Sequence, residues 1–202
     1  MVLAFTSLLP GLFLPLEAIA HEACSYSSRE DGIDVCQSKV PGSSFAKVRA
    51  ESKVCTTAAE LLAVLTNIEE FETWLPYVKE AHLLSKDANS HTYYVLNSSP
   101  WPMKPRDMVY QSSLETHAPG DVVHISIAGL PDYIAPKPSA VRLKQAQGAW
   151  ELSPFGKDPS ILKVTFSMHV EPGRVPATLA NRRIRQTVVG ALKSLRLRFP
   201  CD

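Results

Sequence analysis

The chain has 202 residues, a formal net charge of +1 and a hydrophobic content of 45%. This length fits one domain, and this hydrophobic content allows a large core and excludes a chain that is disordered throughout. The balanced charge gives no reason to expect a nucleic acid as partner or a strongly charged substrate. The distribution of charge along the chain therefore matters more than its total.

The first twenty residues are set apart, because they contain no Lys or Arg and only one acidic residue. Ala18 and Ala20 are small residues at the two positions that a signal peptidase reads, which predicts a signal peptide over residues 1–20 and cleavage before His21. A buried or anchoring N-terminal helix is the alternative. We expect an exported protein, periplasmic or secreted, with a single domain over residues 21–202.

Cysteine usage agrees with export, since all four cysteines follow the expected cleavage site. An even number permits full pairing, and the absence of a CxxC motif argues against a zinc or thioredoxin-type redox site. Four cysteines allow three pairings. We favour Cys24–Cys36 as a local pair and Cys55–Cys201 as a tie between the C-terminus and the body of the domain. Four ordinary buried thiols are the alternative.

The expected domain begins with two strands, over residues 31–40 and 44–54, on either side of a Pro-Gly turn. A helix is predicted from Thr57 to Trp74. Thr57 is followed three residues later by a Glu, which is a typical N-terminal capping pattern, and a proline two residues after Trp74 ends the helix.

From residue 78 to residue 170 the pattern changes to short strands separated by polar turns. The last strand alternates most clearly, because Leu162, Val164 and Phe166 face one way and polar residues face the other. This pattern predicts a meander in one antiparallel sheet rather than parallel strands joined by helices. The candidate strands cover residues 91–97, 106–115, 121–130, 140–145, 149–154 and 161–170.

A long helix is predicted from Pro176 to Phe199. Apolar residues recur along it at spacings of three and four and form a continuous stripe, in which small residues dominate the first half. A long helix across a strongly curved antiparallel β-sheet is the helix-grip arrangement, an α+β fold. The space between sheet and helix is then either a packed core or a ligand cavity.

The opposite side of this helix is basic, with Arg182, Arg185, Lys193 and Arg196. One hypothesis is a transient contact with an anionic membrane through these residues, each cation being worth about 1 kcal/mol near a charged surface. A solvated helix surface is the alternative. We expect the protein to be a monomer.

The sequence contains no recognisable catalytic or metal-binding motif. Its six histidines are scattered, and it has no GxSxG, HExxH or Gly-rich phosphate loop. We therefore predict no catalytic residue, no metal, no cofactor and no enzymatic activity. The aromatic residues are spread over the helix, the strands and the Pro-rich segments, which fits either a core or the wall of a pocket.

Several separated motifs, in the same order, resemble those of the START domain, the lipid-transfer fold named for steroidogenic acute regulatory proteins. The resemblance covers about residues 30–199. DGIDV is similar to the family's opening strand, and Trp74 matches the tryptophan that ends its first long helix. PWPMKPRDMV resembles the family's entry into a central strand, AVRLKQAQGAWELSP a hairpin with Gly148 at its turn, and EPGRVPATLANRRI the approach to the C-terminal helix.

This resemblance implies a hydrophobic tunnel between the sheet and the C-terminal helix, which binds and carries one lipid, sterol or other hydrophobic small molecule. Sterol-carrying members have a second buried Arg six residues after the Arg-Asp motif, and Ser112 in its place disfavours a sterol. An enzyme of the cyclase, aromatase or hydrolase type is the alternative, and would need polar or titratable residues, such as His124, Tyr110 and Arg106, to converge in the tunnel. A regulatory protein with a filled interior is a third interpretation.

Alternation along the strand that starts at Arg106 would turn every second residue toward the tunnel. Arg142 is a second candidate for contact with a polar headgroup, with an outward salt bridge as the alternative. The loop after Gly129, which contains three prolines, is the expected gate beside the C-terminal helix. The full predicted lining is Arg106, Met108, Tyr110, Ser112, Ile125, Ile127, Arg142, Phe166, Met168, Ile184 and Val188.

Overall fold

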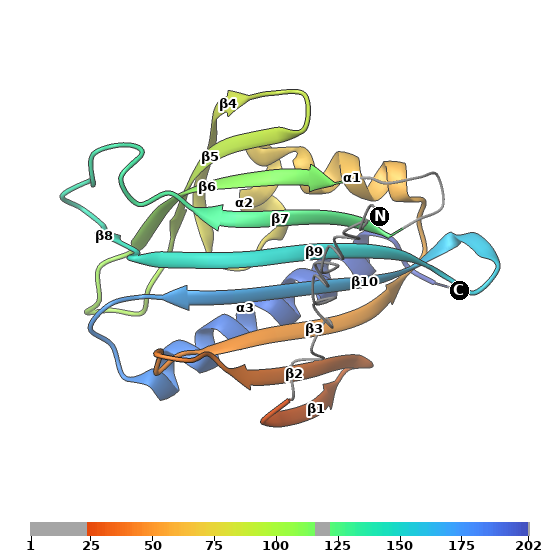
Figure 1. The fold of residues 1–202 in the computed structure, drawn as a ribbon, viewed down its shortest axis with the longest axis horizontal. Helices are drawn as coiled ribbons and strands as arrows, with labels where there is room; N and C mark the ends of the chain where they lie inside the picture. Colours follow the sequence, from red (N-terminus) through yellow and green to blue (C-terminus); the bar gives the residue numbers. More distant parts are fainter. Residues whose placement is uncertain (1–23, 116–121, 202) are drawn as a thin grey trace, which may run out of the picture.

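The computed structural model describes residues 24–115 and 122–201, and the signal peptide predicted over residues 1–20 lies outside them. Most of this part of the chain forms one curved sheet with helices packed on it (Figure 1). The strands are β1 (Tyr26–Glu30), β2 (Ile33–Lys39), β3 (Ala46–Val54), β4 (Val78–Lys86), β5 (Ser90–Asn97), β6 (Arg106–Glu115), β7 (Val123–Gly129), β8 (Val141–Arg142), β9 (Gln145–Phe155) and β10 (Asp158–Glu171). The helical elements are α1 (Ala58–Thr66), η1 (Ile68–Glu70), α2 (Phe71–Trp74) and α3 (Ala177–Arg198).

The strand order is β1-β2-β3-β10-β9-β7-β6-β5-β4, and neighbours in this order are antiparallel. The short β8 pairs in parallel with β6. Because β10 is the last strand in the chain but lies between β3 and β9, it joins the N-terminal strands to the later meander. The predicted antiparallel sheet is thus confirmed, with β1 and β4 in addition to the candidate strands.

The helix predicted over residues 57–74 is interrupted, which corrects the expectation. α1 begins with the expected capping box of Thr57 and Glu60. It ends before Asn67, whose φ of −84° and ψ of 83° lie outside the helical region. Asn is a poor helix former because its side chain competes for backbone hydrogen bonds. The chain resumes as η1 and α2, and this break directs Phe71 into the core, where only 6% of it is exposed.

Gly148 lies inside β9 and not at a turn, which corrects the hairpin expected there. The strands predicted over residues 140–145 and 149–154 become the two-residue β8 and the long β9. A Cβ atom at position 148 would overlap the Met168 sulfur on the adjacent β10. The glycine therefore makes room for Met168, as glycines in strands often do where another group approaches closely.

α3 lies across one face of the sheet, alongside β3 and β10 (Figure 1). Its apolar stripe is buried as predicted: Ala180, Ile184, Val188, Ala191 and Leu195 are all 8% exposed or less. A curved antiparallel sheet that holds one long C-terminal helix is the helix-grip arrangement, so the predicted α+β fold class is confirmed.

Two disulfides fasten the ends of the described chain. Cys24–Cys36 joins the segment before β1 to β2, and Cys55–Cys201 joins the residue after β3 to the segment beyond α3. These are the two pairings that the sequence favoured. Among the residues that the structure describes, no helix is both long and apolar enough to cross a membrane.

Candidate ligand-binding cavity

Two adjoining hollows lie between the sheet and the helices. The smaller, an inner chamber, has a volume of about 90 Å³, and the larger, an outer cavity, has a volume of about 690 Å³. Asn97, Tyr110, Met168 and Thr187 border both, so the two hollows meet there. The inner chamber is lined by Leu65, Phe71, Trp74, Leu75, Pro76, Val78, Tyr93, Val95, Asn97, Tyr110, Ser112, Ile125, Ile127, Trp150, Phe166, Met168 and Thr187.

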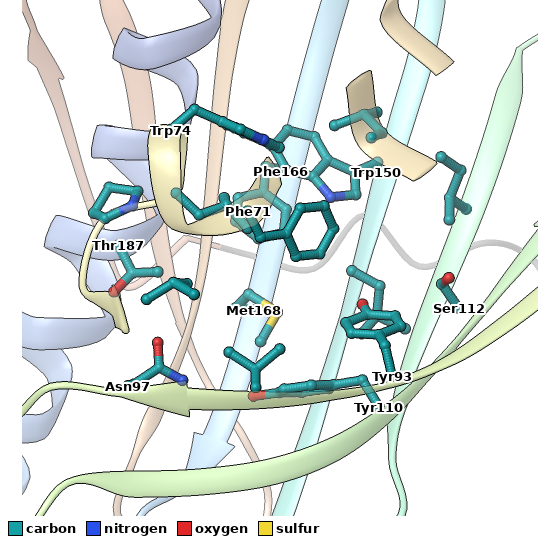
Figure 2. Close-up of a pocket in the computed structure, with 17 residues that line it drawn as sticks. Phe71, Trp74, Tyr93, Asn97, Tyr110, Ser112, Trp150, Phe166, Met168 and Thr187 are labelled. Carbon is teal, nitrogen blue, oxygen red and sulfur yellow. The ribbon is translucent and has the colours of Figure 1, made fainter. Parts of the chain in front are cut away.

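Aromatic side chains from several elements form the walls of the inner chamber (Figure 2). Trp150 of β9 and Phe166 of β10 stack with their ring centroids 3.9 Å apart. Phe71 of α2 meets Tyr93 of β5 edge-on, at 5.6 Å between centroids, and meets Trp74 in the same way at 5.8 Å. Stacked and edge-on contacts are the favourable geometries for aromatic rings. The break after α1 places Phe71 and Trp74 over the sheet.

Polar groups are few in this chamber. Burial raises the pKa of Tyr93 and of Tyr110 well above the ordinary value for a phenol, while a hydrogen bond with Ser112 partly opposes the rise at Tyr93. Both hydroxyls therefore stay protonated at neutral pH and can donate a hydrogen bond. The indole Nε1 of Trp74 is buried and has no hydrogen-bond partner among the described residues. The chamber thus suits an apolar group, with donors available for an occasional polar atom.

The outer cavity opens where β10 leads into α3, at the left end of the sheet in Figure 1. Its rim comes from the β5–β6 loop (residues 98–105), the β10–α3 connection and the first half of α3. Trp101 and Leu179 on this rim are 93% and 53% exposed. The cavity is lined by Tyr77, Asn97, Ser98, Ser99, Pro100, Trp101, Pro102, Met103, Arg106, Tyr110, Leu143, Met168, Val170, Pro172, Val175, Leu179, Ala180, Arg182, Arg183, Ile184, Gln186 and Thr187.

Two partly buried arginines hold the β5–β6 loop beside this cavity. Arg106 donates from Nη1 to the Ser99 hydroxyl at 3.1 Å and to the Lys104 carbonyl at 2.7 Å. Arg183 donates from Nη2 to the carbonyl and hydroxyl of Ser98, at 2.8 and 3.2 Å, and its guanidinium lies 3.1 Å from the centre of the Tyr77 ring. Partial burial lowers the pKa of both arginines, because it disfavours their charged form.

Eight of the eleven predicted lining residues border the two hollows. They are Arg106, Tyr110, Ser112, Ile125, Ile127, Phe166, Met168 and Ile184. Met108 and Val188 do not, because both are completely buried among other core side chains. Their expected role as lining residues is therefore corrected: they support the walls from behind.

The prediction that Arg142 lines the cavity is also wrong, because Arg142 is paired with Asp107 and borders neither hollow. It forms two parallel hydrogen bonds with the Asp107 carboxylate, at 3.1 and 3.0 Å, and it also donates to the carbonyls of Pro131 and Ile134. Asp107 is completely buried and Arg142 is nearly so, with 9% of its side chain exposed. Asp107 alternates with Arg106 along β6 and so points to the opposite face of the sheet.

The loop expected to act as a gate lies on that opposite face. Its residues Leu130, Ile134 and Ala140 pack against a small cluster of buried side chains on β5 and β6. The loop that borders the outer cavity is instead the β5–β6 loop. The sequence placed its prolines at the entry to a strand but carried no sign that it forms the rim.

The basic side of α3 is largely paired with the β1–β2 hairpin. Arg185 pairs with Glu30, Lys193 pairs with Asp31 at 2.6 Å, and the Arg196 guanidinium donates to the Asp31 carbonyl. Only Arg182 of the four predicted membrane contacts borders the outer cavity. The four residues therefore do not form one free basic surface.

His124 does not join Tyr110 and Arg106, so the three residues suggested for an enzyme site do not converge. Ile125 and Ile127, its neighbours on β7, line the inner chamber, so alternation turns His124 to the other face. There its Nδ1 lies 3.7 Å from the Glu115 carboxylate.

An antiparallel sheet wrapped round a C-terminal helix, with a cavity between the sheet and the helices, defines a helix-grip protein. The sequence matches the START domain family over residues 24–199, so the chain belongs to this family. It is similar to a STAR-related lipid transfer protein from Xanthomonas axonopodis, with 32% identity, a TM-score of 0.77 and coverage of 86% of this chain and 97% of that one.

Two further proteins are similar to this chain. An uncharacterized protein of Pseudomonas aeruginosa is 29% identical over 168 residues, which cover 83% of this chain and 82% of that protein. The Zhui aromatase/cyclase of a Streptomyces species is 13% identical, with a TM-score of 0.52 and coverage of 75% of this chain and 92% of that one. The latter shares the fold alone. The START fold supports the binding of lipids or other hydrophobic ligands.

Proposed function

We propose that the protein binds one lipid or other hydrophobic small molecule in the outer cavity and inner chamber, and carries it as a monomeric binding protein. The observation that supports this function is a cavity of about 690 Å³ that continues into an aromatic chamber. This volume falls in the range of roughly 300–1,000 Å³ that is typical of small-molecule sites.

The apolar walls can supply most of the affinity. Burying an acyl chain yields about 0.8 kcal/mol per CH₂ group, so a chain of about twelve carbons offers roughly 10 kcal/mol before the costs of association. A ligand can therefore bind with few polar contacts, which fits the small number of polar groups in the inner chamber.

Ligand exchange takes place at the rim of the outer cavity. The exposed side chains of Trp101 and Leu179 flank the opening and suit contact with the surface of a lipid bilayer. This rim replaces the four-residue basic surface as the proposed membrane contact. Arg182 remains as a basic residue at the same opening.

A carrier is favoured over an enzyme of the same fold. The three side chains considered for an enzyme site are divided between the two faces of the sheet, with His124 on the far side from Tyr110. Catalytic groups must meet at the reacting atoms, within hydrogen-bond reach. The two disulfides are compatible with export to an oxidising compartment, which is where we propose that the carrier works.

The test is the uptake of N-phenyl-1-naphthylamine, a neutral fluorescent probe of apolar cavities, together with native mass spectrometry and lipid extraction of the purified protein. Ala180→Trp should fill the outer cavity, because Ala180 lines it and is 7% exposed. Thr178→Trp adds the same side chain to an exposed position of α3 and is the matched control. We expect uptake by the wild type and the control, and much weaker uptake by Ala180→Trp. A wild type that binds neither probe nor lipid would refute the proposal.

A further inference from the structure

The outer cavity is lined by three basic side chains, Arg106, Arg182 and Arg183. Within residues 24–115 and 122–201, no Asp or Glu lines it. The net charge of +1 for the whole chain therefore hides a local excess of positive charge at the opening. An anion that approaches the opening meets no carboxylate among the described residues of the cavity wall.

These arginines differ from most others in the described part of the chain in what they bind. Arg49, Arg142 and Arg198 each lie within 3.3 Å of a carboxylate oxygen. Arg106 and Arg183 are partly buried, yet their partners are neutral oxygens and, for Arg183, a tyrosine ring. Charges withdrawn from water are normally paired with an opposite charge, because an unpaired one is costly.

The two guanidinium groups are held on the same stretch of rim. Arg183 of α3 binds Ser98, and Arg106 of β6 binds the adjacent Ser99. Each guanidinium has five N–H donors, and the hydrogen bonds to Ser98, Ser99 and Lys104 involve one terminal nitrogen of each. Donors on two side chains thus remain available next to the cavity. Paired N–H donors of this kind match the oxygens of a carboxylate or a phosphate.

We propose that the ligand is an anionic amphiphile, whose carboxylate or phosphate is bound by Arg106 and Arg183, with Arg182 at the rim, and whose acyl chain extends into the inner chamber. This inference rests on the proposed function, because it assigns the polar end of the same ligand. The positively charged opening matches the anionic headgroup of such a lipid, and the aromatic inner chamber matches its apolar chain.

The experiment compares ligands of equal chain length by their displacement of the bound neutral probe from the full chain. The ligands are oleate, oleyl phosphate and oleyl alcohol, and inorganic phosphate alone is included as a headgroup without a tail. Hydrogen bonds to charged groups are worth about 1.5–3 kcal/mol, and about 1.4 kcal/mol is a tenfold change in affinity. We therefore expect at least one of the two anions to bind about tenfold or more tightly than the alcohol.

The comparison of the two anions identifies the headgroup. A preference for oleate assigns a carboxylate, a preference for oleyl phosphate assigns a phosphate, and equal binding of both leaves the shared anionic chemistry. Displacement by inorganic phosphate alone, with no gain from the acyl chain, would overturn the proposed amphiphile. Equal affinity for the alcohol and both anions would overturn the inference and leave the proposed function intact, because the probe would still bind. Absence of probe binding would overturn both.

Variants distinguish two roles of the arginines: binding the ligand headgroup, or only holding the β5–β6 loop in place as a clamp. Arg106→Gln/Arg183→Gln should lose the preference for anions and keep its affinity for the alcohol and the probe. Arg182→Gln, which changes an exposed side chain, should reduce the preference by a few fold. Arg29→Gln removes an equal charge from a side chain that is 71% exposed on β1, and should behave as the wild type. Equal weakening of all ligands in the double variant, with the anion preference retained, would identify the arginines as a clamp only and overturn the proposal.

Discussion

Tyr93 and Tyr110 place two phenol hydroxyls inside a chamber whose walls are mostly apolar. They face each other across neighbouring strands, paired in the β5–β6 register, with ring centroids 5.8 Å apart. Burial keeps both protonated, since the charged form would have to be solvated in an apolar environment. Each hydroxyl can then serve a ligand as donor or acceptor without adding charge to the chamber.

The raised pKa of these two tyrosines predicts a loss of stability in alkaline solution. Unfolded tyrosines ionise near pH 10, whereas the folded ones do so at higher pH, so the unfolded state binds fewer protons above about pH 10. Stability is therefore full below about pH 10 and falls as pH rises, by about 2–3 kcal/mol for the pair between about pH 9 and pH 11. Urea unfolding at both pH values measures it.

Tyr93→Phe/Tyr110→Phe should remove this part of the alkaline loss, because the ionising groups are gone. Tyr133→Phe, at a side chain that is 51% exposed, is the control and should lose stability as the wild type does. An alkaline loss that is identical in the double Phe variant would contradict the assignment.

At the residue scale, the sequence could predict only those lining residues whose direction follows from the alternation of side chains along a strand. The lining residues Tyr110, Ser112 and Phe166 follow from counting along strands that pair regularly. Arg142 could not be placed, because its direction depends on Asp107, which lies 35 positions earlier in the sequence. Arg183 was missed for a similar reason: its partners on the β5–β6 loop come together with α3 only in the folded chain.

At the element scale, the β1–β2 hairpin fastens α3 to the sheet. Two adjacent acidic residues at its tip, Glu30 and Asp31, hold Arg185 and Lys193, which lie about two turns apart on α3. The tip itself is a tight turn, in which Asp31 and Gly32 both have positive φ, as hairpins with two-residue turns require. The hairpin therefore positions the helix that forms one wall of the outer cavity.

The two disulfides should contribute unequally to stability, because they close loops of different length. Their sequence separations are 12 residues for Cys24–Cys36 and 146 residues for Cys55–Cys201. In the chain-entropy description, a longer loop loses more freedom in the unfolded state. Replacing each pair by Ser should lower the free energy of unfolding by about 3 kcal/mol and about 5 kcal/mol, respectively. Denaturant unfolding of the two double variants decides, and a larger loss for the 24–36 pair would contradict this order.

The β5–β6 loop and the first half of α3 together form the rim through which ligand exchanges. Trp101→Ala and Leu179→Ala should slow transfer of a fluorescent lipid between vesicles several fold, because they remove exposed apolar surface at the opening. Binding of the probe in solution should change little. Leu197→Ala is the matched control, since Leu197 is 84% exposed at the far end of α3. Equal rates for all three variants and the wild type would show that the rim has no part in transfer.

Elements in which apolar residues recur at regular spacing were predicted well, and elements without such a pattern were not. β6 has the predicted bounds, and α3 is within one residue of the prediction at each end. β4 was missed because most of it is exposed, so no buried alternation marks it in the sequence. The break at Asn67 was missed because the apolar spacing continues through it, and only the packing of Phe71 against Tyr93 shows what the break achieves.

At the scale of the whole molecule, the sheet and α3 enclose a site with two unlike ends. One end is an opening with arginines, serines and exposed apolar side chains, and the other is a chamber with aromatic walls. The order of motifs along the chain predicted this architecture, although Gly148 lies within β9 and not at the expected turn. The residues that line the site could not all be predicted, because they come from distant parts of the sequence. Folding brings Arg106 and Arg183 to the outer cavity and Trp150 to the adjoining inner chamber.

The central claim, that an acyl chain is bound inside the protein, is tested most directly by tryptophan quenching with a brominated fatty acid. Trp101→Phe leaves two tryptophans, Trp74 and Trp150, and both line the inner chamber. Bromine quenches only at close contact, so saturation with 9,10-dibromostearate should quench most of the emission of this variant, while unbrominated stearate should not. Full emission from Trp74 and Trp150 with the brominated acid bound would contradict the account.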